Sequence, residues 1–241
     1  MIMVSLMEVL EAIRTRRSVR DFTGERIPED HIEKILDAAR YAPSAENLQM
    51  WRYVVIREDQ ELKNLISEVS MEKARETFGT QPREILLGRL WYIKEDSRSK
   101  ALEKMQDEHS WEYIKRSDTI IVCCASESFS DTRTPLPLHL FGSPAVAMGT
   151  LQMWLVAHSM GYGVSWVSLP IIDPRHRELI CEKIGIPRSW EPIAVICIGV
   201  PKQKRMLGPS RFPLESIVYA EHWGNSYKRL AFRKKETISK S

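Results

Sequence analysis

Residues 16–22 read Arg-Arg-Ser-Val-Arg-Asp-Phe and place three guanidinium groups and a hydroxyl within five positions. In an extended stretch alternate side chains point to the same side, so Arg16, Ser18 and Arg20 would converge on one surface. Guanidinium groups bind phosphate oxygens through two parallel hydrogen bonds. A basic end to the preceding helix, favourable to the helix dipole, is the alternative explanation. The segment by itself allows either interpretation.

A second polar segment, residues 43–51, reads Pro-Ser-Ala-Glu-Asn-Leu-Gln-Met-Trp. Its amide and hydroxyl groups can hydrogen-bond the carbonyl and ring-nitrogen edge of a heterocycle. The alternative is a polar turn followed by a core tryptophan, Trp51. Because the residue before a proline disfavours the helical region, Pro43 also predicts the end of a preceding helix.

Helices are predicted around these two segments from apolar residues at helical spacing. Four such positions precede the basic segment, and four more follow Pro28, which opens the second helix. These positions are Leu6, Val9, Leu10 and Ile13, then Ile32, Ile35, Leu36 and Ala39. A third helix, from Ser143 to Met160, has almost no polar face. Such a helix is buried on most sides, which predicts a central core helix or a subunit interface.

Apolar and β-branched runs predict four strands, at residues 53–56, 119–125, 164–167 and 193–200. A further helix begins at Asp173-Pro174 and ends at Gly185. Strands that alternate with helices indicate an α/β or α+β fold. Residues 58–116 are charged and mixed, and we expect one or two surface helices with loops there. With no linker visible, residues 1–241 are predicted to be a single domain.

The two polar segments together resemble the nitroreductase family. That family has Arg-Arg-Ser-Val-Arg-x-Phe, followed about twenty residues later by Ala-Pro-Ser-Ala-x-Asn-x-Gln-x-Trp, as this chain does. Later segments fall in the family's order, at 143–160, 161–168, 198–201 and 210–215. The resemblance spans residues 6–219. Within it residues 58–140 match poorly and are treated as a variable insertion, and residues 220–241 as a C-terminal extension.

The resemblance implies an α+β fold, with a central, mostly antiparallel sheet flanked by helices, in an intertwined homodimer. It also implies two FMN sites at the dimer interface. One subunit would hold the phosphate, ribityl chain and pyrimidine edge through Arg16, Arg17, Ser18 and Arg20, with Arg211 joining at the phosphate. The other subunit would contribute Pro43, Ser44, Ala45, Asn47 and Gln49. The backbone around Ser168 and Leu169 would face the flavin N5 and O4.

The implied activity is an FMN-dependent oxidoreductase that uses NADH or NADPH to reduce nitroaromatics, quinones or related small electrophiles by ping-pong hydride transfer. The flavin carries this chemistry, so no catalytic side chain is named. Arg20 is the cation expected to stabilise negative charge at N1 and O2. The chain departs from the family at two places. Leu169 stands where a glycine is frequent, and Pro209-Ser210-Arg211 stands where Lys-x-Arg is frequent.

Two other functions stay open at this point. A looser resemblance to the flavin domain of coenzyme F420 glutamate ligases rests on Trp190-Glu191-Pro192 and on the loop 131–137. It implies a cofactor-biosynthesis enzyme that acts on a deazaflavin-like substrate. The third hypothesis is a flavin-binding protein without catalytic activity.

Composition excludes several other classes. A net charge of +3, with basic density only in the tail at 228–235, does not favour nucleic-acid binding. Four cysteines without Cys-x-x-Cys spacing predict buried thiols in a reducing compartment, with Cys123 and Cys124 on opposite faces of a strand. No metal-ligand spacing, Walker-type loop or hydrolase motif occurs. No apolar run is long enough to span a membrane, so a cytoplasmic protein that acts on a small molecule is expected.

Overall fold

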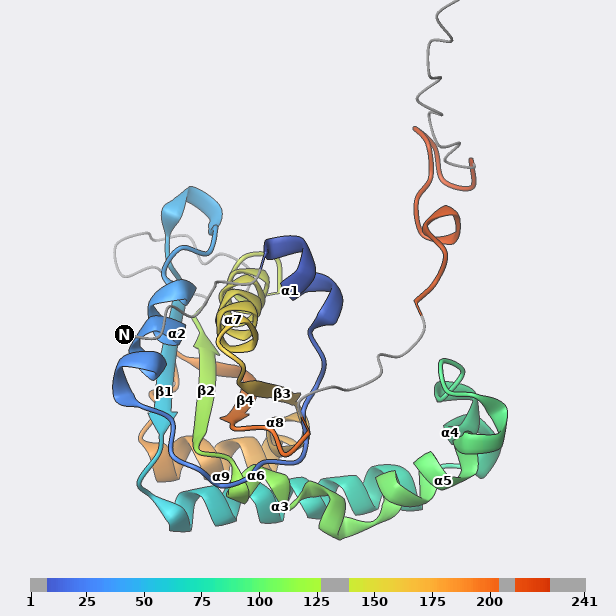
Figure 1. Cartoon of the computed structure of the whole chain (residues 1–241). Helices are drawn as coiled ribbons and strands as arrows, with labels where there is room; N and C mark the ends of the chain where they lie inside the picture. The colour runs from blue at the N-terminus through green and yellow to red at the C-terminus, as the bar shows by residue number, and fades with distance from the viewer. Residues whose placement is uncertain (1–7, 127–138, 204–210, 226–241) are drawn as a thin grey trace, which may run out of the picture.

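A computed structural model describes residues 8–126, 139–203 and 211–225 of the chain. Its centre is a four-stranded sheet in the order β1-β2-β4-β3, in which every neighbouring pair is antiparallel. The strands are β1 (Trp51–Ile56), β2 (Thr119–Ala125), β3 (Gly163–Val167) and β4 (Glu191–Gly199). Helices cover both faces (Figure 1), so the predicted α+β fold with an antiparallel sheet flanked by helices is confirmed.

The two central strands, β2 and β4, are apolar along almost their whole length and are buried on both faces. Successive side chains along β2 point to opposite faces of the sheet, where they join different apolar clusters. Cys123 packs in the cluster above the sheet, and Cys124 packs in the cluster below it. The two thiols therefore lie on opposite faces, as expected. All four cysteines are free.

One face of the sheet is covered by α2 (Glu29–Ala39) and α7 (Gly142–Ser159). The buried side of α2 is Ile32, Ile35 and Ala39, as its spacing predicts. The two helices approach closely because α7 has a glycine at their contact. A Cβ on Gly149 would lie 2.3 Å from the Tyr53 hydroxyl and 3.4 Å from the Ala39 carbonyl.

The apolar helix at 143–160 was predicted to be a central core helix or a subunit interface, and within a single chain α7 is only partly covered. Met148 is 38% exposed and Leu151 is 45% exposed, although neither residue is polar. The short helix α1 (Val9–Thr15) lies beside α7 and also exposes apolar side chains, Val9, Leu10 and Ile13. The α7 helix therefore presents more apolar surface than the rest of a single chain covers.

The other face is covered by α3 (Gln60–Gly79), α6 (Tyr113–Arg116), α8 (Leu169–Ile172) and α9 (Pro174–Ile184). The predicted strand and helix boundaries after residue 117 agree with the structure to within two residues. The α9 helix begins at its Asp173 cap and ends at Gly185, which has a φ of +77°.

Residues 58–116 differ from the prediction of one or two surface helices with loops. The twenty-residue helix α3 packs against the sheet, and α4 (Arg83–Arg89) and α5 (Glu95–Gln106) form a small separate cluster with its C-terminal end. Polar residues on the buried side of α3, such as Lys63, Ser67 and Ser70, obscured its apolar face in the sequence. The short 3-10 turns η1 (Ala45–Asn47), η2 (Glu108–Trp111) and η3 (Leu214–Ser216) complete the described elements.

The basic segment after α1 crosses the end of the sheet. Ser18 forms a parallel bridge with Val164 of β3, and Phe22 forms an antiparallel bridge with Pro201, just after β4. Both contacts depend on glycines, since a Cβ on Gly163 or on Gly199 would lie 2.7 Å from the side chain of Val19 or Phe22. The sheet therefore fixes the path of residues 16–22 in an extended form.

The start of the first predicted helix at Leu6, the loop 131–137, Pro209-Ser210 and the basic tail lie outside the described residues. Within the described ranges, no helix has the length and apolar character needed to cross a membrane.

Candidate functional site

Arg16, at the end of α1, lies beside α7. Its guanidinium carbon is 4.6 Å from the centre of the Trp154 ring, a cation–π distance. The pKa of Arg16 is lowered from its usual value, first by burial and then by the positive charges of Arg211 and Arg17. Arg16, Arg17 and Arg211 are called the arginine cluster below. The charge of Arg211, which is distant in the sequence, therefore affects the same guanidinium group as the charge of Arg17 in the basic segment.

The neighbours of Arg16 are an aromatic ring and other cations. Among the described residues, Arg16 and Arg17 form no ion pair with a carboxylate. Arg17 is turned back onto α1, where Nη1 donates to the carbonyl oxygens of Arg14 at 2.7 Å and Arg16 at 2.6 Å. These bonds satisfy carbonyl groups at the helix end and hold the extended segment against α1.

Ser18 and Arg20 follow along the same segment. The bridge to β3 holds Ser18 at the edge of the sheet, where it is half-buried. The exposed side chain of Arg20 forms a hydrogen bond with the hydroxyl of Tyr113. That hydroxyl is 3.1 Å from Ser165 Oγ on β3. Burial is the main reason that the pKa of Tyr113 rises to about 12, so the phenol stays neutral beside Arg20.

The second predicted segment, residues 43–49, forms a strained turn. Glu46, Asn47 and Gln49 have φ angles of 51°, 56° and 50°, in the left-handed region that non-glycine residues rarely adopt. The turn is held internally, because Gln49 N–H donates to Ser44 Oγ at 3.0 Å and Gln49 Nε2 donates to Asn47 Oδ1 at 3.3 Å. Pro43 and Ala45 complete it, with Ala45 opening η1. Strain of this kind clusters at ligand and active sites.

One chain does not bring the two segments together. In Figure 1 the turn around η1 lies beyond α2, and the basic segment leaves α1 on the other side of α7. In a single chain the two segments therefore lie on different sides of α2 and α7 (Figure 1). That the two segments come from different subunits stays a prediction.

Ser168 and Leu169 lie at the start of α8, directly after β3. Ser168 is exposed and its Oγ accepts a hydrogen bond from Trp166 Nε1 at 3.2 Å. The side chain of Leu169 packs against two apolar clusters, the one below the sheet and the one formed with α4 and α5. Leucine at the position where the family frequently has glycine is thus accommodated by packing against these two clusters.

His158, on α7, borders the arginine cluster. Its Nε2 is 2.8 Å from Thr15 Oγ1. Burial lowers the pKa of His158, and the charges of Arg16 and Arg17 lower it further. The described part of the chain contains no group of three His, Cys, Asp or Glu residues that could hold a metal ion.

Two residues of the site were missed by sequence reasoning. Trp154 was assigned to an apolar helix face, and nothing local indicated that Arg16 would lie over its ring. Tyr113 falls in the stretch 58–116, where no motif was visible. Only the contact between α6 and the basic segment reveals its position beside Arg20.

The chain matches the model of the Nitroreductase family over residues 13–200. A Methanothermobacter thermautotrophicus protein, provisionally named an NADH dehydrogenase/NAD(P)H nitroreductase, is 29% identical, with 88% of this chain and 89% of that protein covered. The FMN reductase [NAD(P)H] of Bacillus subtilis is 25% identical, with 90% of this chain and 75% of that protein covered. A Bacteroides fragilis nitroreductase, solved with bound FMN, has a TM-score of 0.60 and 20% identity, with 89% of this chain and all (100%) of that chain covered.

Proposed function

The chain belongs to the nitroreductase family, and on that premise we propose that it is a homodimeric FMN enzyme. It takes electrons from NADH or NADPH and reduces small electrophiles such as nitroaromatics or quinones. The names of the relatives support the redox class, since the Bacillus subtilis protein is an FMN reductase that uses NAD(P)H. One observation carries the assignment to this chain: the arginine cluster beside Trp154.

The arginine cluster fits the phosphate of FMN. Like charges repel, and the lowered pKa of Arg16 shows that its charged form is disfavoured by burial and by its neighbours. The opposite charge and the hydrogen bonds of a phosphate dianion would offset both effects, because guanidinium groups match its oxygens in geometry and charge. We assign Arg16 and Arg211 to the phosphate, with Arg17 adding charge while it holds the end of α1.

The rest of the basic segment fits the remainder of the cofactor. Ser18, held at the sheet edge, offers a hydroxyl to the ribityl chain. Arg20 would face the pyrimidine edge, and Tyr113 positions its guanidinium group through a neutral hydroxyl. Ser168 and Leu169, at the exposed end of β3, would present backbone groups to the other edge of the ring. Bound FMN would supply the chemistry, by accepting a hydride and passing it to the electrophile.

This chain's residues would therefore bind and orient rather than transfer protons. A fixed cation at Arg20 stabilises negative charge on the ring edge that it faces. The side chain of Leu169 and the small cluster around α4 and α5 close an apolar wall beside the strand end. No catalytic side chain is assigned.

Two features support the homodimer. The apolar side chains that α1 and α7 leave exposed in a single chain form a surface typical of a subunit interface. The strained turn 43–49 carries hydrogen-bonding groups far from its own basic segment. A second subunit would bring the turn to the other chain's site.

The visible absorption spectrum of the purified protein tests this proposal first. Peaks of oxidised flavin, with one FMN per chain, are expected, together with sedimentation at twice the chain mass. Anaerobic addition of NADH or NADPH should bleach the flavin peaks, and a quinone should restore them. A colourless protein that gains no FMN on titration would contradict the cofactor. A yellow protein that NAD(P)H does not bleach would instead indicate flavin binding without this activity.

A further inference from the structure

A cavity of about 420 Å³ lies outside the proposed flavin site. Its walls come from the turn after the basic segment, from α3, from the α6–β2 connection and from the chain after β4. Five cationic side chains line it: Arg26, Lys63, Lys115, Arg116 and Lys202. Among the described residues that line the cavity, Asp118 carries the one carboxylate. The cavity is therefore rich in positive charge.

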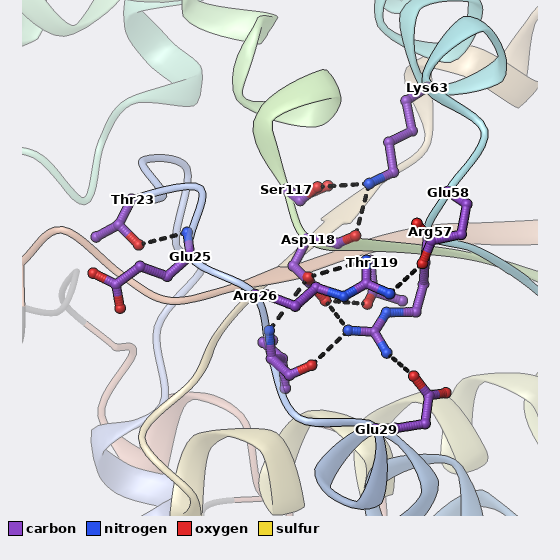
Figure 2. Close-up of polar contacts among 11 residues, drawn as sticks. Thr23, Glu25, Arg26, Glu29, Arg57, Glu58, Lys63, Ser117, Asp118 and Thr119 are labelled. Atoms are coloured by element: carbon purple, nitrogen blue, oxygen red, sulfur yellow. Dashed lines mark hydrogen bonds and ion pairs between the residues drawn. The ribbon is translucent and has the colours of Figure 1, made fainter.

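Lys63 is the buried cation of this wall. It is 4% exposed, and its Nζ donates to two main-chain carbonyl oxygens, that of Ser117 at 3.1 Å and that of Asp118 at 2.7 Å. Figure 2 shows the side chain reaching from α3 to both. An ammonium group has three protons, and no carboxylate in the described part of the chain pairs with this one. Burial is the main cause that lowers the pKa of Lys63.

The negative charge of Asp118 acts to raise the pKa of Lys63 and so partly offsets the effect of burial, but the carboxylate forms its hydrogen bonds with other groups. Its Oδ2 accepts from Arg57 Nη2 at 2.9 Å and from Thr119 Oγ1 at 2.7 Å, and its Oδ1 accepts from Ile27 N–H at 3.3 Å. Arg57 also bonds Glu29. Arg57, Asp118, Glu29, Arg26 and Glu58 form the ion-pair cluster drawn in Figure 2.

The other cations of the wall pair mostly with carboxylates that do not line the cavity. Lys202 pairs with Asp21 at 2.8 Å, Lys115 and Arg116 pair with Glu112, and Arg26 pairs with Glu58 and also, at 3.7 Å, with Asp118 of the wall. Arg26, Lys202 and Arg116 each have about half of the side chain exposed, at 51%, 47% and 56%. Exposed ion pairs contribute little, so Lys202 and Arg116 can turn to an anion inside the cavity at small cost.

We propose that this cavity binds a small anion carrying a phosphate group, at a site separate from the flavin. Two guanidinium groups, Arg26 and Arg116, match phosphate oxygens in geometry, and the buried Lys63 supplies a point charge. None of the lining residues belongs to the proposed flavin site. The cavity lies on the side of the sheet covered by α3 and α6, whereas Arg16 lies against α7.

Isothermal titration with inorganic phosphate and with glycerol 3-phosphate tests the proposal. FMN-saturated protein in a phosphate-free buffer is used, so that the arginine cluster is already occupied. One saturable site per chain is expected. Tighter binding of the ester would indicate a phosphorylated metabolite, and equal binding would indicate free phosphate; both support the proposal.

Variants locate the binding. Arg116→Ala and Lys202→Ala alter exposed side chains and should fold normally, and each should weaken phosphate binding several-fold. Lys63→Met should weaken it roughly tenfold to a hundredfold. Lys34→Ala, an exposed lysine on α2 that pairs with Asp30, is the matched control and should bind as the parent does.

Two results would overturn the proposal. One is the lack of saturable binding at millimolar phosphate. The other is binding that Arg16→Ala abolishes while Arg116→Ala and Lys202→Ala leave it unchanged, which would place the phosphate at the arginine cluster. Should the protein not bind FMN, the same titration of a variant carrying both Arg16→Ala and Arg211→Ala still tests the cavity, since that variant lacks the two arginines assigned to the phosphate.

Discussion

Two groups of arginines in this protein differ in what surrounds them. In the ion-pair cluster, Arg57 is 7% exposed at its side chain and meets the carboxylates of Asp118 and Glu29. In the arginine cluster, Arg16 meets the Trp154 ring and the charges of Arg17 and Arg211. A buried cation that is paired within the chain holds the fold together. A cation gathered with other cations stores unfavourable energy that a bound anion can offset.

The largest effect is expected when the ion-pair cluster is broken. Asp118→Ala would leave Arg57 with a buried, weakly compensated charge and remove the partners of Ile27 N–H and Thr119. Loss of one partner of a buried pair costs about 3–5 kcal/mol of unfolding free energy. Urea unfolding measures this loss. Glu58→Gln, at an exposed pair of the same cluster, should cost less than about 1 kcal/mol. Equal effects of the two variants would remove the distinction between buried and exposed pairs.

Removal of a charge from the arginine cluster should have the opposite effect on stability from removal of a charge from the ion-pair cluster. Arg16→Ala relieves repulsion and should leave the stability of the unliganded protein unchanged or slightly higher. FMN binding should weaken by about 1.5–3 kcal/mol, or roughly tenfold to a hundredfold, because one guanidinium–phosphate pair is lost. Fluorescence titration with FMN measures this change. Arg14→Ala, an exposed arginine two residues earlier in the last turn of α1, is the control. If Arg16→Ala and the control bind FMN equally, the phosphate is not held at this cluster.

Arg20 is expected to act on the cofactor's potential more than on its affinity. Arg20→Gln removes the charge near the ring edge and should make the two-electron midpoint potential of bound FMN more negative. An effect of about 1 kcal/mol corresponds to roughly 20 mV. Tyr113→Phe keeps the charge but removes the hydrogen bond, so a smaller shift in the same direction is expected. Spectroelectrochemistry measures both. A potential unchanged in Arg20→Gln would place Arg20 away from the ring.

The smallest expected effect is on His158. Its pKa is lowered by burial and by Arg16 and Arg17, so FMN phosphate at the arginine cluster should raise that pKa. An NMR titration of the imidazole, with and without FMN, measures the change. Because the unfolded chain binds this proton more readily, the folded protein loses stability from His158 as pH falls through about 6.5, and bound FMN should reduce that loss. A pKa that FMN leaves unchanged would contradict the placement of the phosphate beside α7.

The sequence by itself determined the features that depend on near neighbours along the chain. The strand at 119–125 and the helix between Asp173 and Gly185 follow from local runs and caps, and both occur where predicted. The family was indicated by two motifs, at residues 16–22 and 43–51, because their residue types and spacing can be read directly from the sequence. The prediction for residues 58–116 was wrong, because buried polar residues such as Lys63 interrupt the apolar face of α3.

Only the tertiary structure decided which distant groups meet. It placed Trp154 under Arg16, Tyr113 beside Arg20 and Asp118 beside Arg57, and it kept the turn 43–49 away from its own basic segment. It also showed that α7, apolar nearly all round, stays partly open in a single chain. Helix and strand periodicity records which way a side chain faces along its own element, whereas a contact between elements depends on packing of the whole domain. The charges of this protein were therefore visible in its sequence, but their partners were set by its fold.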